Sequence, residues 1–209
     1  MFITFEGPEG SGKTSQLPAL ATYLEGLGYQ VVCTREPGGT PISDQIREIL
    51  TSMKNQELHP RTEILLFLAA RAQLVEQVIK PALEAGKIVL CDRYGDSTLA
   101  YQGYGHGLDL TILRQMLEFA TDHLKPDLTL FLDLDVEIGL ARKTKSAEWN
   151  RLDAYALAFH KRVRNGYHQL IAEEPERWVS VDATQDIDAV QAALRKTILN
   201  KIKSISLEL

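Results

Sequence analysis

A phosphate-binding loop stands near the start of the chain. Residues 7–14 read Gly-Pro-Glu-Gly-Ser-Gly-Lys-Thr and match the pattern G-x-x-x-x-G-K-[ST] in full. Glycines let backbone N–H groups turn inward around a polyphosphate, and a following helix N-terminus adds partial positive charge. Lys13 can reach the β- and γ-phosphates, and the Thr14 hydroxyl can serve Mg²⁺. The loop predicts a nucleoside triphosphate site made of Gly7, Pro8, Glu9, Gly10, Ser11, Gly12, Lys13 and Thr14.

Glu9 is an unusual residue for such a loop, because its carboxylate would repel a polyphosphate. We expect a Mg²⁺ shell, a basic neighbour or a substrate hydroxyl to offset that repulsion, and an outward-facing, solvated Glu9 is the alternative. The loop contains no arginine. Cationic stabilisation of a transferred phosphoryl group must therefore come from elsewhere in the chain.

Two further pairs of residues could contribute to ligand binding, one to phosphate or Mg²⁺ and the other to a base. Asp92 and Arg93 end an apolar run, where Asp92 could hold Mg²⁺ through water and Arg93 could grip a phosphate in a bidentate fork. A structural ion pair is the alternative. Phe67 and Arg71 lie four residues apart in a helical pattern, so they share a helix face. A base could stack on Phe67 while Arg71 reads its edge; a core Phe with a solvated Arg is the alternative.

A basic segment predicts a lid. Arg142, Lys143 and Lys145 fall within four residues and Arg151 follows. A charge run is usually a solvated face, but this one follows the fourth predicted strand, on the side where the triphosphate would bind. We expect residues 141–151 to form a short lid that closes over that site.

The elements that must position these residues alternate along the chain. Short apolar runs typical of strands buried on both faces occur at Phe2–Phe5, Gln30–Thr34, Lys87–Cys91, Leu128–Asp133 and Trp178–Val181. Helical patterns occur at Lys13–Leu27, Ser43–Met53, Thr62–Glu84, Leu110–His123, Val136–Lys143, Asp153–Ala172 and Ile187–Ile202. This alternation predicts an α/β fold with a parallel five-stranded sheet and helices on both faces. Ligands in such folds bind beyond the carboxyl ends of the strands.

Composition limits the class of protein. The chain has 209 residues and a formal net charge of −5, which predicts one domain over 1–209 and disfavours binding to bulk nucleic acid or a membrane surface. We find no leader pattern and no apolar run of membrane-spanning length, so we expect a cytoplasmic protein. Cys33 and Cys91 lie in apolar runs and are expected to be reduced and buried.

Two classes of P-loop protein remain open at this point. Asp92-Arg93-Tyr94-Gly95 fits the D-x-x-G pattern of GTPase-type switches, but the guanine-reading N-K-x-D pattern is absent. A kinase for a nucleotide or a deoxynucleoside needs a second site facing the γ-phosphate and a basic lid. Candidates for both are present, so a kinase is favoured over a switch.

Nearly the whole chain resembles the thymidylate kinase family, because four motifs of that family occur in the right order. They lie at 5–14, at 34–40 (Thr-Arg-Glu-Pro-Gly-Gly-Thr), at 67–73, and at 92–94 with 97–98 and 100–103. The resemblance implies a nucleoside monophosphate kinase-like fold with a short lid. It also implies in-line transfer of the ATP γ-phosphoryl group to dTMP with Mg²⁺, no covalent intermediate, a place in dTTP biosynthesis, and a homodimer. With no P-loop arginine, the chain resembles the bacterial type whose catalytic arginine is in the lid.

The same resemblance implies roles for individual residues. Glu9 would bind the deoxyribose 3′-hydroxyl, and Tyr101 would pack under the sugar. The base would be held by Phe67, Arg71, Thr98 and Gln102. The remaining substrate contacts would come from Arg35, Arg47, Arg93 and Tyr167.

The resemblance also implies the catalytic cations: Lys13, Arg93, Arg142 and Arg151. Lys143 and Lys145 would belong to the ATP side of the lid, where the family more often has arginines. That departure leaves open whether Arg142 or Arg151 meets the transition state.

Overall fold

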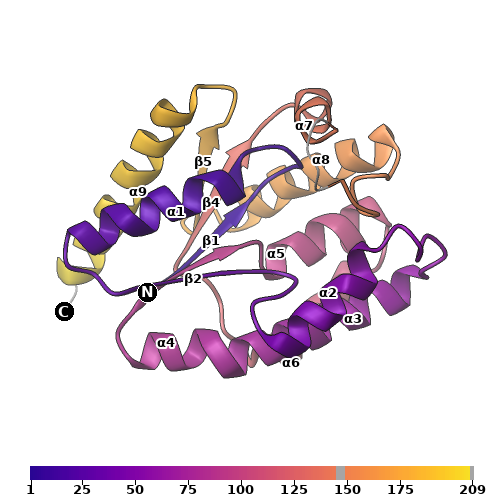
Figure 1. Cartoon of the computed structure of the whole chain (residues 1–209), viewed down its shortest axis with the longest axis horizontal. Helices are drawn as coiled ribbons and strands as arrows, with labels where there is room; N and C mark the ends of the chain where they lie inside the picture. Colours follow the sequence, from indigo (N-terminus) through magenta and orange to yellow (C-terminus); the bar gives the residue numbers. More distant parts are fainter. Residues whose placement is uncertain (145–148, 208–209) are drawn as a thin grey trace.

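One parallel sheet forms the centre of the computed structural model, which describes residues 1–144 and 149–207 (Figure 1). Its strands are β1 (Phe2–Glu6), β2 (Val31–Arg35), β3 (Ile88–Asp92), β4 (Leu128–Asp133) and β5 (Trp178–Asp182). They lie in the order β2-β3-β1-β4-β5, and every neighbouring pair is parallel. The predicted five-stranded parallel sheet is confirmed. Because β1 is central, the loop that follows it emerges in the middle of the carboxyl edge.

Helices cover both faces of this sheet. They are α1 (Lys13–Gly26), α2 (Pro41–Thr51), α3 (Pro60–Leu74), α4 (Lys80–Glu84), α5 (Gly95–Thr98), α6 (Leu110–Thr121), α7 (Val136–Lys143), α8 (Leu157–Glu173) and α9 (Ile187–Leu207). Figure 1 shows α1 and α9 together on one face, with α3, α4 and α6 on the other. In the described ranges, no helix combines the length and apolar composition needed to cross a membrane.

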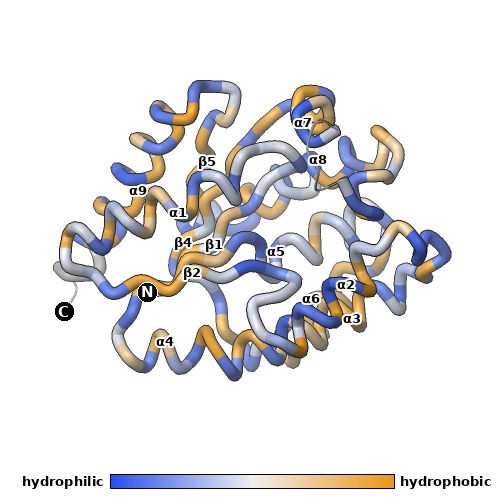
Figure 2. Tube along the Cα trace, in the orientation of Figure 1, coloured by the Kyte–Doolittle hydropathy of each residue, from blue (hydrophilic) through white to orange (hydrophobic). Residues whose placement is uncertain are grey.

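Alternation along the strands divides the core between the two faces. Ile3 and Phe5 of β1 pack with Leu20 of α1 and Leu194 of α9. Phe2, one residue away, points to the opposite face and packs with residues of α4 and β3. Figure 2 shows hydrophobic residues running from the N-terminus into β1, as expected for a strand buried on both sides.

Local sequence signals set the helix starts nearest the carboxyl edge. Thr40 caps α2 by accepting a hydrogen bond from Ser43 N at 3.1 Å, and Pro41 occupies the first turn, where its missing N–H costs nothing. Asp135 caps α7 in the same way, accepting from Glu137 N at 3.0 Å. These caps hold the loops after β2 and β4 in place beside the P-loop.

Two helical regions differ from the prediction. The helix expected over Thr62–Glu84 is continuous but contains a π-helical segment, η1 (Val75–Ile79), just before Pro81, which has no N–H to continue an α-helical ladder. Residues 95–105 were not predicted to be helical, yet they form α5 and a second π-helical segment, η2 (Leu99–Gly105). Gly105 lets η2 approach α8, since a Cβ there would come within 2.7 Å of Phe159.

The prediction for Cys33 is wrong. Cys91 of β3 is buried as expected, but Cys33 of β2 is exposed. The reason is the strand order: β2 is an edge strand that pairs only with β3, and its residues are half-buried or exposed. Both cysteines are free thiols, as predicted.

Candidate active site

The P-loop joins β1 to α1 and curls around the ammonium group of Lys13. Gly7, Gly10 and Gly12 have φ values of 146°, 70° and 90°, a region that other residues rarely adopt. Lys13 Nζ donates to the backbone oxygens of Gly7 and Pro8 at 3.1 and 2.9 Å, and to Ser11 Oγ at 3.1 Å. Burial, together with the nearby charge of Arg93, lowers the pKa of Lys13 to about 8.

Helix α7 touches this loop backbone to backbone. A Cβ on Gly139 would lie 2.1 Å from the backbone oxygen of Glu9, and one on Gly10 would lie 2.1 Å from the backbone oxygen of Gly139. Both positions therefore require glycine. Sequence reasoning missed Gly139, whose one signal was a glycine inside a predicted helix.

Thr14 and Asp92 form an oxygen pair beside Lys13. Thr14 Oγ1 donates to Asp92 Oδ2 at 2.7 Å, joining the start of α1 to the end of β3. Mg²⁺ in kinase sites is usually held by one or two carboxylates together with waters and substrate phosphates. A hydroxyl and a carboxylate facing the P-loop fit that donor set.

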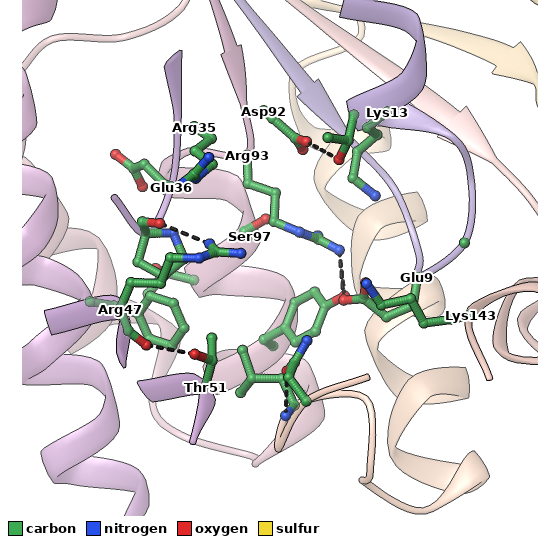
Figure 3. Close-up of a pocket in the computed structure, with 18 of the residues that line it drawn as sticks. Glu9, Lys13, Arg35, Glu36, Arg47, Thr51, Asp92, Arg93, Ser97 and Lys143 are labelled. Carbon is green, nitrogen blue, oxygen red and sulfur yellow. Dashed lines mark hydrogen bonds and ion pairs between the residues drawn. The ribbon is translucent and has the colours of Figure 1, made fainter. Parts of the chain in front are cut away.

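Arg93 forms hydrogen bonds to several different parts of the site. Its φ of 68° turns the side chain back from β3 across the loop. Its NH2 group donates to Glu9 Oε1 at 2.7 Å and to the Tyr101 hydroxyl at 3.0 Å. Its NH1 group donates to the Gly7 oxygen at 3.1 Å. Figure 3 shows the guanidinium directed at Glu9.

Arg93 gives Glu9 a basic neighbour, one of the three ways in which its charge was expected to be offset. Burial opposes its ionisation, but Arg93 and Lys13 outweigh burial and hold the pKa of Glu9 at about 2. The Tyr101 hydroxyl also donates to Glu9 Oε1, at 2.7 Å. The carboxylate is not an outward-facing solvated group, which was the alternative.

Behind Arg93 lies Glu6, a residue to which sequence reasoning gave no role. It is fully buried and accepts hydrogen bonds from Tyr94 N at 2.8 Å, Ser97 Oγ at 2.6 Å and the Tyr167 hydroxyl at 2.7 Å. Burial and the charge of Asp96 raise the pKa of Glu6 to about 7. A glutamate ending an apolar run was the signal that could have revealed it.

Tyr167 differs from its predicted place. It was expected to line the substrate end, but its side chain is fully buried and it is not among the residues that line the cavity. Its hydroxyl accepts from Arg93 NH1 at 3.2 Å and donates to Glu6. Tyr167 of α8 thus helps to hold Arg93 in place through a hydrogen bond, on the side of Arg93 that faces Glu6.

A cavity of about 550 Å³ collects most of the other predicted residues along the carboxyl edge (Figure 3). Its lining includes Glu9, Gly10, Gly12, Lys13, Thr14, Arg35, Arg47, Phe67, Arg71, Asp92, Arg93, Thr98, Tyr101, Gln102, Arg142 and Lys143. Sequence reasoning assigned no role to some other lining residues: Ser15, Glu36, Pro37, Thr51, Asn150 and Leu152. The P-loop end and the Phe67–Arg71 end belong to one continuous space.

At the Phe67 end, Arg71 is a buried and firmly held cation rather than a solvated one. Only 1% of it is exposed. Its Nε donates to Glu36 Oε2 at 2.7 Å, its NH1 to Thr98 Oγ1 at 2.9 Å, and its NH2 to the Tyr94 oxygen at 3.0 Å. Its NH2 group also lies 2.5 Å from Glu36 Oε2, so of the five N–H donors of the guanidinium one, on NH1, is left for a ligand.

Four other predicted cations line the cavity, and each has a partner within the protein. Arg142 NH1 donates to the Ala183 oxygen at 3.2 Å, and Lys143 Nζ lies 4.0 Å from Asp153. Arg35 NH2 lies 3.5 Å from Asp44, and Arg47 NH1 donates to the Pro37 oxygen at 2.9 Å. Lys145 lies outside the described residues.

Arg151 differs from the other lid cations. It is buried and does not line the cavity; its NH2 group lies 2.5 Å from Glu63 Oε2. Its Nε and NH1 groups donate to the Leu50 oxygen and the Tyr155 hydroxyl, each at 2.8 Å. This position favours a structural role, and catalysis by Arg151 stays a prediction.

The sheet, the P-loop and a second basic site on the same cavity define a P-loop kinase of the nucleoside monophosphate kinase type. A family model described as thymidylate kinase matches residues 5–194. A thymidylate kinase of Thermomicrobium roseum is 53% identical over 203 residues, with 97% of this chain and 96% of that protein covered. One from Herpetosiphon aurantiacus is 48% identical, with 99% of each covered.

Structure comparison agrees with these sequence matches. A crystal structure of thymidylate kinase from Ehrlichia chaffeensis matches with a TM-score of 0.77 and 37% sequence identity, covering 95% of this chain and 98% of that one. The chain belongs to the thymidylate kinase family.

Proposed function

We propose that this chain transfers the γ-phosphoryl group of ATP to dTMP, giving ADP and dTDP for dTTP biosynthesis. The observation that carries the proposal is the continuous cavity. It is lined by Lys13 and Thr14 as well as by Phe67 and Arg71, and Arg93 lines the same space. Family membership supports the same donor and acceptor. A GTPase-type switch is not favoured, because such a switch needs no second nucleotide site.

Catalysis would rest on positioning and charge neutralisation, with no nucleophile from the protein. Lys13 would bind the β- and γ-phosphates once they replace its present backbone partners. Thr14 and Asp92 would hold Mg²⁺, Asp92 through water. When bound, Mg²⁺ neutralises charge on the transferred phosphoryl group.

The acceptor would lie across Arg93. Arg93 and Arg47 would hold the dTMP phosphate, while Glu9 would accept the 3′-hydroxyl hydrogen bond and Tyr101 would pack under the sugar. Arg35 would support the loop after β2. Phe67 would stack on the base, with Arg71 donating to its O4 atom and Thr98 and Gln102 beside it.

Residues 141–151, of which 145–148 lie outside the described part of the chain, would form a lid on one domain spanning 1–209. Arg142 and Lys143 already line the cavity and are the lid cations nearest to it among the described residues. Arg142 is accordingly the better-supported candidate for the transition-state cation. A cytoplasmic location stays a prediction.

A homodimer is also part of the proposal. Helix α3 packs against α6, and these two helices leave large apolar side chains exposed: Leu65 at 57%, Ile112 at 55% and Phe119 at 89%. Large exposed apolar side chains on a pair of packed helices fit an interaction surface. A second copy of this chain would cover it.

A substrate panel tests the activity. ADP release is measured with ATP and Mg²⁺ against dTMP, dUMP, dCMP, dGMP and thymidine separately, with Lys13→Ala as the blank. We expect dTMP to stimulate release far above the others. Stimulation by a different acceptor would favour a related P-loop kinase instead, and no stimulation by any acceptor would refute the kinase.

A further inference from the structure

Glu63 of α3 is a buried carboxylate whose two oxygens bind two different parts of the molecule. Its Oε1 accepts from Gln102 Nε2 at 2.8 Å and lies 3.5 Å from His106 Nε2. Its Oε2 lies 2.5 Å from Arg151 NH2 and accepts from the Tyr155 hydroxyl at 2.9 Å. No exposed surface remains on this side chain. One oxygen therefore faces the cavity wall formed by η2, and the other faces the segment before α8.

The charge of Glu63 determines how Gln102 can be oriented. Burial opposes ionisation, but contacts from His106, Arg151 and Gln102 outweigh it and hold the pKa of Glu63 at about 2. Glu63 is thus a carboxylate at neutral pH, and a carboxylate only accepts hydrogen bonds. The amide of Gln102 must present its NH₂ group to Glu63, since the reverse orientation would place two oxygens face to face.

The other end of that amide is a free acceptor in the cavity. Gln102 lines the cavity, and no residue in the described ranges donates a hydrogen bond to its Oε1. That oxygen is also not sealed inside the protein. Arg71, fixed by Glu36, lines the same cavity with one N–H donor left on NH1 and is bonded to Thr98, four residues before Gln102 on the same helical run.

A fixed donor beside a fixed acceptor distinguishes pyrimidine bases by their edges. Thymine and uracil present an acceptor at O4 and a donor at N3–H, which complement Arg71 and Gln102. Cytosine presents a donor at its 4-amino group and an acceptor at N3, so both contacts become repulsive. Mismatched polar groups in a buried site are strongly discriminating, because each is left without a partner.

We propose that Glu63 is a specificity-determining positioning residue, which selects 4-oxo over 4-amino pyrimidine nucleotides by fixing the orientation of the Gln102 amide. Glu63 does not touch the substrate; it acts through Gln102. The inference rests on the proposed function, since it assigns the base-reading end of that same site.

The test compares dTMP with 5-methyl-dCMP, which differs from dTMP only at the edge that Arg71 and Gln102 would read. In Glu63→Gln the new amide can donate or accept, so Gln102 can flip. We expect the ratio of kcat/KM for dTMP over 5-methyl-dCMP to fall by about tenfold, the equivalent of about one hydrogen bond. Tyr155→Phe is the matched control, because it disturbs only the other oxygen of Glu63; its ratio should be unchanged.

A double-mutant cycle separates positioning from general damage to the fold. Gln102→Met keeps the length of the side chain and removes the amide, so it should lower the ratio by itself. Glu63→Gln added to Gln102→Met should lower it no further. An equal additional fall in that background would refute action through Gln102.

Two other outcomes would overturn the inference. Full discrimination in Gln102→Met would show that the amide does not read the base, even if Glu63→Gln fails to fold. An unchanged ratio in folded Glu63→Gln would show that Glu63 does not orient it. The wild-type chain is assayed first: if dTMP is not its substrate, the proposed function fails, and this is distinguishable because no variant is involved.

Discussion

The carboxyl group of Glu6 should make the protein less stable as the pH rises through neutrality. Its pKa rises from an ordinary value of 4.5 to about 7, because burial and the charge of Asp96 oppose ionisation. The native state therefore keeps a proton that the unfolded chain releases at lower pH. The stability that this group contributes is fully present below pH 4.5 and is lost as the pH rises through about 7.

The size of the effect follows from the same two values. A tenfold change in a proton equilibrium corresponds to ~1.4 kcal/mol, so a pKa that rises from 4.5 to about 7 is linked to about 3 kcal/mol of unfolding free energy. Replacing Glu6 by Gln removes the titration and keeps a side chain of similar shape. A constant difference in stability between the two proteins carries no information about the titration.

The assay is urea unfolding of both proteins between about pH 4.5 and about pH 8. The free energy of unfolding of wild type minus that of Glu6→Gln should fall by about 3 kcal/mol across this range. The pKa of Asp153 is also raised, to about 6, but both proteins share that group and its contribution cancels. Parallel stability curves for the two proteins would refute a protonated Glu6 in the native state.

Other predictions address the site directly. Lys13→Ala should lower kcat by about 10²–10³-fold with little change in thermal unfolding, and a rate near wild type would remove Lys13 from the mechanism. Arg93→Lys keeps the charge but loses the fork, so kcat/KM for dTMP should fall at least ~10-fold while KM for ATP changes little. Gly139→Ala should cost about 1–3 kcal/mol of stability, because its Cβ would meet the Glu9 oxygen at 2.1 Å; Gly26→Ala, with nothing within 4 Å, is the matched control and should be neutral. Phe119→Asp should convert the proposed homodimer to a monomer in analytical sedimentation. A variant that remains dimeric would exclude the α3–α6 surface as the dimer interface.

Contiguous signals made much of the fold predictable. The strands of the sheet are short apolar runs, and the P-loop is a single stretch of sequence whose glycines and Lys13 act on their own neighbours. Prediction from the sequence failed where tertiary packing overrides the local sequence pattern. Residues 95–105 carry three glycines and gave no helical signal, yet they are helical because α8 covers them. Cys33 looked buried because an apolar run does not reveal whether its strand lies at an edge.

The sequence by itself determined which residues were available for the chemistry: a phosphate loop, Thr14 and Asp92 as separate candidates for Mg²⁺, and Arg93 as a candidate phosphate-binding cation, on a parallel sheet. These follow from local spacing and from the rule that parallel strands bring their carboxyl ends to one edge. Only the tertiary structure decided the contacts between distant residues. It placed Arg151 on Glu63 across 88 positions and Tyr167 on Glu6 across 161. A buried carboxylate takes its charge and its role from the partners that reach it, and those partners are chosen by packing rather than by neighbourhood in the chain.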